Sequence, residues 1–493
     1  MKILLLNSPF KTEYGRFSRN SRSPAVTKSG TLYYPIWLAS VAGVLEKAGH
    51  DVLFIDACAD KYTREQTYEL VRPFNPSLII LDTSTPSIYN DVEIGAELKE
   101  FLPASIVVLM GTHPTAMPEE TLAINPRIDV VIRGEADMTA LEIATFFERE
   151  TTSVARGKLN EINGISFIDK NRVVHTPERE RIKDLDSLPF LSQIYRKHLN
   201  YRSYFFSAAE HPMIMLMTSR GCPAKCNFCV YPQTVHKHQY VYRSVVNIIE
   251  EMKYIAEAFP DVYSVGFEDD TFTFNKKRLQ EFCTALVDAG LHKRFRWWVN
   301  ARVNTLDSDM MKMMKKAGCR LLIPGFESSN QEILDNIGKG TKVEDALVFM
   351  ENARKAGLLV HGCFMVGNQG ETRKTMENTL RFALKLNPDT AQFFPMIPYP
   401  GTKAYEWALK NNYLRFSSFS DWLTNEGLHN TILNPGMLTS EDLVRFCNYA
   451  RRRYYLRTSY ILRKAIQSLS SFSEMKRNFR AFRSIISFLV KNK

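Results

Sequence analysis

Residues 219–229 read Ser-Arg-Gly-Cys-Pro-Ala-Lys-Cys-Asn-Phe-Cys, so one short loop carries Cys222, Cys226 and Cys229. Three thiolates at spacings of four and three residues can hold three irons of a cubane iron–sulfur cluster, and they leave the fourth iron without a protein ligand. An open metal position serves chemistry, whereas a purely structural site is closed. We therefore predict a reactive metal cluster on this loop.

Two other interpretations of these cysteines stay open at this point. One is a zinc site completed by His236 or His238, because zinc normally takes a fourth Cys or His. The other is three unrelated thiols. The remaining five cysteines are scattered through apolar or helix-like runs and suggest no disulfide framework: Cys58, Cys283, Cys319, Cys363 and Cys447. Buried thiols fit a reducing compartment, so the sequence predicts a cytoplasmic protein.

The length of 493 residues predicts two or three domains. The composition, with 45% hydrophobic and 24% charged residues, is that of an ordinary globular protein. The first apolar run ends at Asn7-Ser8-Pro9, which is too early for a signal peptide, and no apolar stretch is long enough to span a bilayer.

The net charge of +11 is concentrated near the C-terminus. Residues 451–493 contain 12 Lys or Arg and one acidic residue, Glu474. Residues 459–466 and 482–490 are basic and amphipathic, which predicts a helical region over 406–493 in peripheral contact with an anionic membrane, at its inner face. The alternative is that these helices pack on the catalytic domain with a solvated basic face. No nucleic-acid recognition module is present, so no nucleic-acid partner is expected.

Five apolar runs alternate with helix-like segments over residues 1–150. The runs are residues 2–6, 52–56, 78–82, 106–110 and 130–133. Short buried strands joined by crossover helices predict an α/β domain built on a doubly wound parallel sheet. Ligands of such sheets bind beyond the carboxyl ends of the strands. The candidate ligand-binding residues there are small or polar: Thr83, Ser84, Thr85, Gly111, Thr112, His113, Gly134 and Glu135.

Residues 151–205 contain turn signals and one small hairpin, over 165–168 and 172–175, and are predicted to be a linker. The β/α alternation returns over 206–405, with strands expected at residues 213–218, 263–270, 296–302, 320–328, 360–367 and 390–395. Six such units predict a partial (β/α)6 barrel of the TIM type, with its chemistry at the carboxyl ends of the strands. The candidate site residues at these ends are Asp269, Asp270, Arg302, Glu327, Ser328, Gly367 and Gly370.

Each of these strand-end residues also has a structural interpretation. Asp269 and Asp270 could cap the next helix, and Glu327 could pair with Arg302. The turn at residues 367–372 could simply begin a helix. After the cysteine loop, each successive strand ends in polar residues. This order along the chain favours a functional site.

The pattern Cys-x-x-x-Cys-x-x-Cys, with Phe228 before its last cysteine, resembles the signature of radical S-adenosylmethionine enzymes. Residues 31–39, 111–114 and 133–135 resemble the subclass that carries a cobalamin-binding domain ahead of the radical domain. The resemblance covers nearly the whole chain. It implies three cofactors, namely a 4Fe–4S cluster, S-adenosylmethionine and cobalamin.

The resemblance also implies roles for single residues. The open iron would take the amino and carboxylate groups of S-adenosylmethionine. Residues 367–372 resemble the family's Gly-x-x-Gly-Glu-Thr turn, with Gln369 where proline is more usual, and residues 398–402 match its terminal loop. The residues implied to lie near the adenosyl, ribose or amino-acid groups, or near the substrate, are Asp269, Asp270, Glu327 and Ser328.

One departure from the cobalamin-binding pattern concerns the lower face of the metal. Many such domains carry Asp-x-His-x-x-Gly, whose histidine ligates cobalt, but no histidine precedes His50 in this chain. The cobalamin is therefore expected to have no protein imidazole on that face. His113 is expected to contact the tail or side chains of the ligand, or to serve only its loop. The alternatives are a ligand-free scaffold and a sheet that binds another nucleotide.

We expect a methyltransferase in which one S-adenosylmethionine methylates cobalamin and a second is cleaved to a 5′-deoxyadenosyl radical. That radical would allow methyl transfer to an unactivated carbon or phosphorus centre of a small-molecule, lipid or glycan substrate. An electron donor such as flavodoxin or ferredoxin would reduce the cluster. The alternatives are a radical cyclisation, oxidation or rearrangement, as in the anaerobic porphyrin-ring cyclases of this subclass, and a non-catalytic corrinoid or iron–sulfur carrier.

Overall fold

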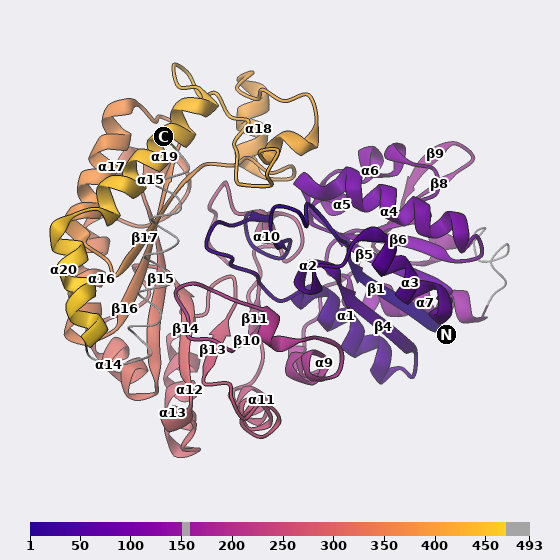
Figure 1. Ribbon diagram of the computed structural model, residues 1–493, viewed down its shortest axis with the longest axis horizontal. Coiled ribbons are helices and arrows are strands. Elements are labelled where there is room, and N and C mark those ends of the chain that lie inside the picture. The colour runs from indigo at the N-terminus through magenta and orange to yellow at the C-terminus, as the bar shows by residue number, and fades with distance from the viewer. Residues whose placement is uncertain (150–157, 470–493) are drawn as a thin grey trace.

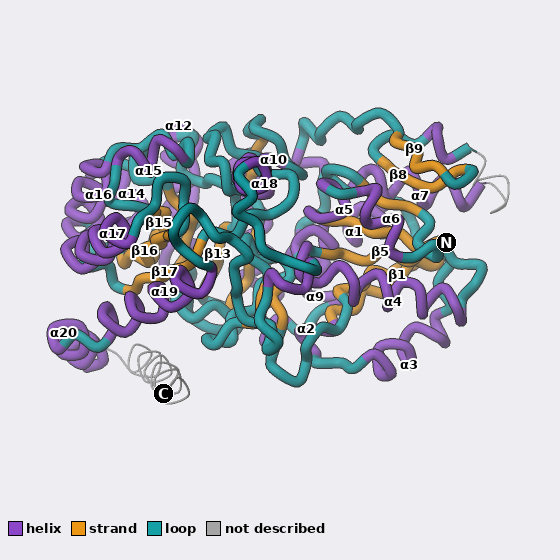
Figure 2. The backbone as a smooth tube through the Cα atoms, turned by 90° about the horizontal axis from the view of Figure 1, so that it is seen from above, coloured by secondary structure: helices purple, strands orange, loops and turns teal. Residues whose placement is uncertain are grey.

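The computed structural model describes residues 1–149 and 158–469 of the chain (Figure 1). Its two large sheets lie toward opposite ends of the long axis, and loops gather between them (Figures 1 and 2). No helix in the described ranges is long and apolar enough to cross a membrane.

The first sheet has the strand order β4-β1-β5-β6-β7-β8-β9. Its parallel strands are β1 (Lys2–Asn7), β4 (Asp51–Asp56), β5 (Leu78–Thr83), β6 (Ile106–Gly111) and β7 (Val130–Ile132). Helices cover both faces: α1 (Ile36–Lys47) and α7 (Asp137–Arg149) on one, and α3 (Arg64–Phe74), α4 (Ile88–Phe101) and α6 (Pro118–Ile124) on the other.

Alternation along β1 explains why this sheet needs two helical layers. Ile3 and Leu5 join the core under α1 and α7, while Leu4 and Leu6 join the core under α3 and α4. Successive side chains of a strand point to opposite faces, so a continuously apolar strand is buried on both sides. The predicted doubly wound parallel sheet is confirmed.

The hairpin of β8 (Ile165–Asp169) and β9 (Arg172–His175) forms where the sequence predicts it, but it does not stand apart as a connector. β8 pairs antiparallel with β7, in a register that joins Val131 to Ser166. Without this pairing β7 would be an edge strand with a row of unpaired backbone groups. The hairpin therefore extends the first sheet.

The second sheet has six parallel strands in chain order, and its first and last strands do not pair with each other. The strands are β10 (Met213–Leu216), β13 (Ser264–Phe267), β14 (Arg296–Ala301), β15 (Cys319–Glu327), β16 (Leu359–Val366) and β17 (Thr390–Pro395). The intervening helices are α11 (Val245–Ala258), α12 (Lys276–Asp288), α14 (Ser308–Lys316), α16 (Val343–Lys355) and α17 (Arg373–Leu386). The predicted partial barrel is confirmed.

Helix α19 (Ser440–Tyr455) covers the open edge of β17. The Tyr455 hydroxyl accepts a hydrogen bond from the Ala391 N–H at 2.9 Å and donates one to the Ala391 carbonyl at 2.7 Å. Arg451 donates to the Phe393 carbonyl at 2.5 Å. Side chains of α19 thus take the hydrogen bonds that a seventh strand would otherwise make.

The inner face of the barrel is accessible near β16 and β17. Val360, Phe364 and Phe393 face the helical layer and are buried. The alternate residues His361 and Cys363 are half-buried. Their neighbour on β17, Gln392, is exposed. A TIM barrel normally fills its interior with side chains, whereas this inner face stays partly accessible at Gln392.

The short elements connect these layers: β2 (Phe17–Ser18), β3 (Ala25–Val26), α2 (Ala57–Asp60), α5 (Thr112–Ala116), α9 (Leu191–His198), β11 (Ser219–Arg220), α10 (Val230–Gln233), β12 (Val241–Tyr242), α13 (Leu291–Arg294), α15 (Gln331–Asn336), α18 (Lys403–Lys410) and α20 (Thr458–Leu469).

Candidate functional site

The cysteine loop follows β10 and β11, at the carboxyl end of the barrel. Cys222 and Cys226 are buried and Cys229 is half-buried. Burial raises the pKa of the Cys222 and Cys229 thiols above the ordinary value. The protein alone therefore favours neutral thiols, and a bound metal must hold them as thiolates.

Two features shape this loop. Gly221 has φ +84°, and a Cβ there would lie 1.9 Å from the Gln239 carbonyl oxygen, so only glycine fits. The side-chain N–H groups of Gln233 reach the carbonyls of Cys226, Asn227 and Cys229 at 3.2, 2.9 and 2.9 Å. Gln233 is a site residue that the sequence analysis missed, because a glutamine after a cysteine motif has no distinctive signature.

The two histidines of the zinc alternative are engaged elsewhere. His236 Nδ1 lies 2.7 Å from Asp270 Oδ2, and His238 Nδ1 lies 3.1 Å from the Cys222 carbonyl oxygen. In the part of the chain that the structure describes, no three His, Cys, Asp or Glu side chains are grouped closely enough to hold a single metal ion.

Asp269 and Asp270 accept hydrogen bonds from the residues that lead into the cysteine loop. Asp269 accepts hydrogen bonds from the Thr218 N–H, the Thr218 hydroxyl and the Ser219 hydroxyl, each at 2.6 Å. Asp270 accepts from the Gly221 N–H at 2.9 Å. Neither residue caps α12, whose N-cap is Asn275, so the capping alternative is wrong. Their contact with the adenosyl group or the substrate stays a prediction.

Positive charge gathers beside Cys226. Arg302 Nη1 lies 3.7 Å from the Cys226 sulfur, and Arg302 also donates to the Lys339 carbonyl. Glu327 pairs with Lys339 at 2.7 Å, not with Arg302 as the structural alternative had it. Burial lowers the pKa of Lys339, but Glu327 and the Cys226 sulfur outweigh it and raise that pKa. Lys339 was missed because its place after α15 has no motif.

Glu327 combines a strained backbone with an unused oxygen. Its φ of +58° is unusual for a residue other than glycine. Its Oε2 atom is buried without a hydrogen-bond partner. Ser328 is buried beside it and accepts a hydrogen bond from the Asn330 N–H at 3.2 Å. A buried unpaired acceptor at a strained position is typical of a ligand-binding site.

The remaining barrel candidates lie around this centre. The Phe228 ring is partly buried, with Lys339 Nζ 6.0 Å from its centroid. Gly367 and Gly370 have φ of +90° and +87°, so both turn positions need glycine. Thr372 caps α17, which confirms the structural interpretation of that turn; the functional interpretation stays a prediction.

A pocket lies between the first sheet and the cysteine loop. The loops after β5, β6 and β7 form one wall, and Arg220, Tyr231, His236 and Tyr399 contribute from the barrel side. Gly111 lets two of these loops approach, because a Cβ there would lie 2.2 Å from the Thr83 carbonyl oxygen. The predicted residues that line the pocket are Thr83, Ser84, Thr85, Gly111, Thr112, Gly134 and Glu135.

Several polar atoms of this pocket's lining residues are buried without a hydrogen-bond partner. They are Asn20 Oδ1, Thr83 Oγ1, Arg220 Nε and His236 Nε2. Buried polar groups in proteins are almost always hydrogen-bonded. These atoms therefore indicate a ligand with many hydrogen-bonding groups.

His113 does not line the pocket, although the sequence places it among the candidates. It is buried, its Nδ1 lies 3.2 Å from Thr85 Oγ1, and its ring contacts Phe419 edge to face at 4.6 Å. Burial lowers its pKa to about 3, so the imidazole is neutral. His113 therefore contacts the loop that contains Thr85 but not the pocket itself.

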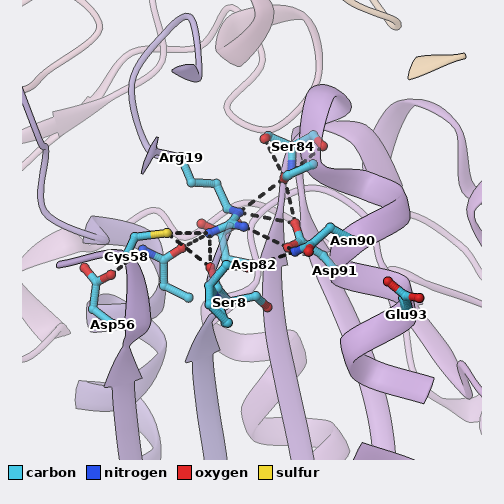
Figure 3. Close-up of polar contacts among 12 residues, drawn as sticks. Ser8, Arg19, Asp56, Cys58, Asp82, Ser84, Asn90, Asp91 and Glu93 are labelled. Atoms are coloured by element: carbon cyan, nitrogen blue, oxygen red, sulfur yellow. Dashed lines mark hydrogen bonds and ion pairs between the residues drawn. The ribbon is translucent and has the colours of Figure 1, made fainter. Parts of the chain in front are cut away.

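The base of the pocket is a charged network that the sequence analysis missed (Figure 3). Arg19, from the loop between β1 and α1, pairs with Asp91 at 2.7 Å, with both side chains buried. The next residue, Asn20, donates to Asp82 at 2.8 Å. Burial raises the pKa of Asp82 to about 7. Of the residues that line the pocket, only His236 carries an imidazole, and it comes from the barrel half.

Comparisons with known proteins agree with this geometry. A model of the radical SAM superfamily matches residues 216–383, and a model of the B12 binding domain matches residues 22–144. The chain is 31% identical over 464 residues to an uncharacterized methyltransferase of Pyrococcus horikoshii, covering 94% of each chain.

A second relative and a solved structure extend the comparison. The anaerobic magnesium-protoporphyrin IX monomethyl ester cyclase of Cereibacter sphaeroides is 29% identical, over 86% of this chain and 67% of that protein. The fold resembles that of the radical S-adenosylmethionine methyltransferase TsrM from Kitasatospora setae, solved with tryptophan and a SAM analog. The TM-score is 0.67, with 17% identity over 91% of this chain and 88% of that one.

Proposed function

Because the chain belongs to the cobalamin-dependent radical S-adenosylmethionine methyltransferases and their relatives, we propose that it methylates an unactivated carbon or phosphorus centre. The cofactors of this family are a 4Fe–4S cluster, S-adenosylmethionine and cobalamin. In our proposal residues 1–150 hold the cobalamin, and residues 151–205, whose hairpin extends the first sheet, link the halves. Residues 206–405 carry the radical chemistry, and residues 406–493 are a helical, basic region, of which 470–493 lie outside the described residues.

One observation supports this proposal: the pocket and the cysteine loop are adjacent. Arg220 and His236 line the pocket, and they flank the segment that holds the three cysteines. Methyl transfer with both cofactors needs the two sites to adjoin, since the methyl donor must reach the carbon activated beside the cluster. A protein that used the cluster and cobalamin in separate reactions would not need the two sites to adjoin.

The residues present fit the cofactors. When bound, the cluster supplies the electron that cleaves the sulfonium of S-adenosylmethionine, and cobalamin carries the methyl group. The cysteines would bind three irons, and Arg302 with Lys339 would offset the negative charge of the cluster. The unpartnered atoms Asn20 Oδ1 and Thr83 Oγ1 suit the amide side chains of a corrin.

The substrate class we propose is a small molecule, a lipid or a glycan that enters the accessible face of the barrel. The inner surface near β16 and β17 offers the exposed Gln392 amide for hydrogen bonds. Both ring nitrogens of His361 are engaged beside it, Nδ1 with the Thr390 hydroxyl at 2.7 Å and Nε2 with Gln392 Oε1 at 3.5 Å. Burial lowers the pKa of His361 to about 4, so its imidazole is neutral at physiological pH. These neutral groups favour a substrate whose part near β16 and β17 forms hydrogen bonds but carries no formal charge.

The experiment that tests the proposal is product analysis. Anaerobically reconstituted protein would be incubated with a reductant, methyl-deuterated S-adenosylmethionine and fractionated small-molecule and lipid extracts. We expect 5′-deoxyadenosine and S-adenosylhomocysteine in comparable amounts, with deuterated methyl in one extract component. Boiled protein is the control.

The same experiment separates the alternative outcome. A cyclisation, oxidation or rearrangement, which the 29% identical cyclase favours, would give 5′-deoxyadenosine with no S-adenosylhomocysteine above the boiled control. That result would exclude methyl transfer. We also propose an external electron donor of the flavodoxin or ferredoxin type, because the cluster must be reduced before each cleavage.

We further propose that the protein is cytoplasmic and makes peripheral contact with an anionic membrane through α20 and the adjoining base of the barrel. The basic residues of the α20 region turn inward: Arg463 donates to the Pro388 carbonyl at 3.0 Å, and Arg457 lies over the Tyr454 ring at 4.3 Å. Residues 482–490 lie outside the described residues. The large apolar side chains that face outward in this region are Leu456, Ile461, Leu462 and Ile466.

The positive charge of the proposed membrane surface comes from the base of the barrel. A groove there is lined by Lys293, Arg296, Lys315 and Lys316, and also by Gln467 of α20. Glu210 is the only acidic residue among those that line it. Basic side chains beside an exposed apolar helix face are the combination that binds anionic bilayers.

Vesicle sedimentation tests this surface. Reversing two charges with Lys315→Glu and Lys316→Glu should weaken binding to phosphatidylglycerol vesicles by at least about thirtyfold. Each lost lysine contributes about 1 kcal/mol at an anionic surface, and each introduced glutamate adds repulsion. Lys170→Glu with Lys183→Glu, on the exposed hairpin turn and linker, is the matched control and should bind as the wild type does. Equal binding to phosphatidylcholine vesicles would refute an electrostatic contact.

A further inference from the structure

His236 is held rigidly between the pocket and the cysteine loop. Its side chain is 2% exposed. The ring stacks on Tyr231 at 5.6 Å with an interplanar angle of 17°, and the edge of Trp37 packs against it at 4.5 Å. Two aromatic neighbours leave the imidazole little freedom to rotate, so each ring nitrogen has a fixed direction.

The two ring nitrogens have different surroundings. Nδ1 lies 2.7 Å from Asp270 Oδ2. Burial acts to raise the pKa of Asp270, but His236 and Arg22 outweigh it and lower that pKa, so the carboxyl is ionised. An ionised carboxylate can only accept, which places the proton on Nδ1. Nε2 is buried without a partner among the described residues, and it belongs to a residue that lines the pocket.

Asp270 connects this histidine to the cluster loop. Its Oδ2 also accepts a hydrogen bond from the Gly221 N–H at 2.9 Å. Gly221 directly precedes Cys222, and its backbone conformation is one that only glycine tolerates there. Movement of His236 would therefore be transmitted through one carboxylate to the first cysteine of the cluster motif.

On the basis of the proposed function, we propose that His236 is a cobalamin-binding residue whose Nε2 forms a hydrogen bond with an amide group at the corrin periphery. Asp270 orients the imidazole and joins this contact to the cysteine loop. His236 lies on the barrel side of the pocket, whereas Asn20 and the strand-end loops lie on the other side. The corrin would thus be held from both halves of the protein, and the contact from the barrel half would be linked to the cluster.

Two substitutions separate the two ring nitrogens. His236→Asn can keep a donor toward Asp270 but is too short to reach the pocket. His236→Gln can place an amide group near the position of Nε2 but cannot also keep the bond to Asp270. Binding of aquocobalamin would be measured by absorbance titration of anaerobic protein with its cluster reconstituted. We expect His236→Asn to raise the Kd about tenfold and His236→Gln to change it by less than about threefold.

Cluster retention gives the second readout. Iron release to a chelator should be faster in His236→Gln than in wild type, because the link from Gly221 through Asp270 loses its histidine. The matched control is His238→Asn, on the same loop but outside the residues that line the pocket, and it should leave the cobalamin Kd unchanged.

Three results would overturn the inference. One is an unchanged Kd in His236→Asn. Another is a Kd in His236→Gln that rises as much as in His236→Asn. The last is nitrogen coupling in the electron paramagnetic resonance spectrum of bound cob(II)alamin that disappears in His236→Asn, since it would make His236 an axial ligand instead. Wild-type protein that binds no cobalamin would refute the proposed function itself, so the two failures are distinguishable.

Discussion

Cys226→Ala should yield a protein that cannot keep its iron–sulfur cluster and cannot cleave S-adenosylmethionine. With one thiolate lost, two irons of the cubane have no protein ligand. Arg302, whose Nη1 lies 3.7 Å from the Cys226 sulfur, would then have no anionic partner at that corner. We expect 5′-deoxyadenosine formation to fall by on the order of a thousandfold or more, because the bound cluster is the source of the electron.

The measurement combines iron and sulfide analysis, absorbance and electron paramagnetic resonance on anaerobically reconstituted protein. Cys283→Ala is the matched control, since Cys283 is a buried thiol within α12 that faces the helical core. It should keep a wild-type cluster and wild-type cleavage. A cubane spectrum that survives in the triple variant Cys222→Ala, Cys226→Ala, Cys229→Ala would contradict the assignment of the ligands.

The cysteine loop and the two sheets could be predicted because their signals are local. Residues 222–229 carry their spacing in eight consecutive positions, and each buried strand shows its apolar run directly. A strand such as β1 needs no knowledge of its partners to be recognised, since continuous hydrophobicity already implies burial on both faces.

The network at the base of the pocket could not be predicted, because its partners are far apart in the chain. Arg19 pairs with Asp91, which lies 72 residues later in the chain, and Asn20 donates to Asp82, which lies 62 residues later. A single arginine in a polar loop is usually solvated, so nothing local marks Arg19 as buried. Only the fold brings this loop over the carboxyl ends of β1 and β5.

The same reasoning explains why the side-chain contacts of single residues could not be predicted. Glu327 and Arg302 end neighbouring strands, which made an ion pair plausible, but Lys339 from the next connection lies closer to Glu327. His113 follows a strand end as a ligand-binding residue would, yet α5 begins at Thr112 and the imidazole packs on Thr85 and Phe419. Strand position predicts which end of a sheet a residue occupies, but not the direction of its side chain.

Arg220 makes one of the buried contacts between the halves of the protein. Its guanidinium donates to both carboxylate oxygens of Asp137 in α7, at 2.7 and 3.0 Å, and to the Ser40 hydroxyl at 3.0 Å. The two charged side chains are 1% and 4% exposed. Arg220 also lies two residues before Cys222, so this ion pair joins the first sheet directly to the cluster loop.

Arg220→Met should lower the free energy of unfolding by about 3–5 kcal/mol, because removal of one partner leaves the buried Asp137 carboxylate without its counter-charge. Urea denaturation of the holoprotein measures the loss. Arg64→Met, which removes an arginine from a half-exposed cluster with Glu93 and Glu97, should cost less than about 1 kcal/mol. Addition of Asp137→Asn to Arg220→Met should recover much of the loss, because no buried charge then remains unpaired. A cost for Arg220→Met as small as that for Arg64→Met would show that the buried pair does not hold the two halves together.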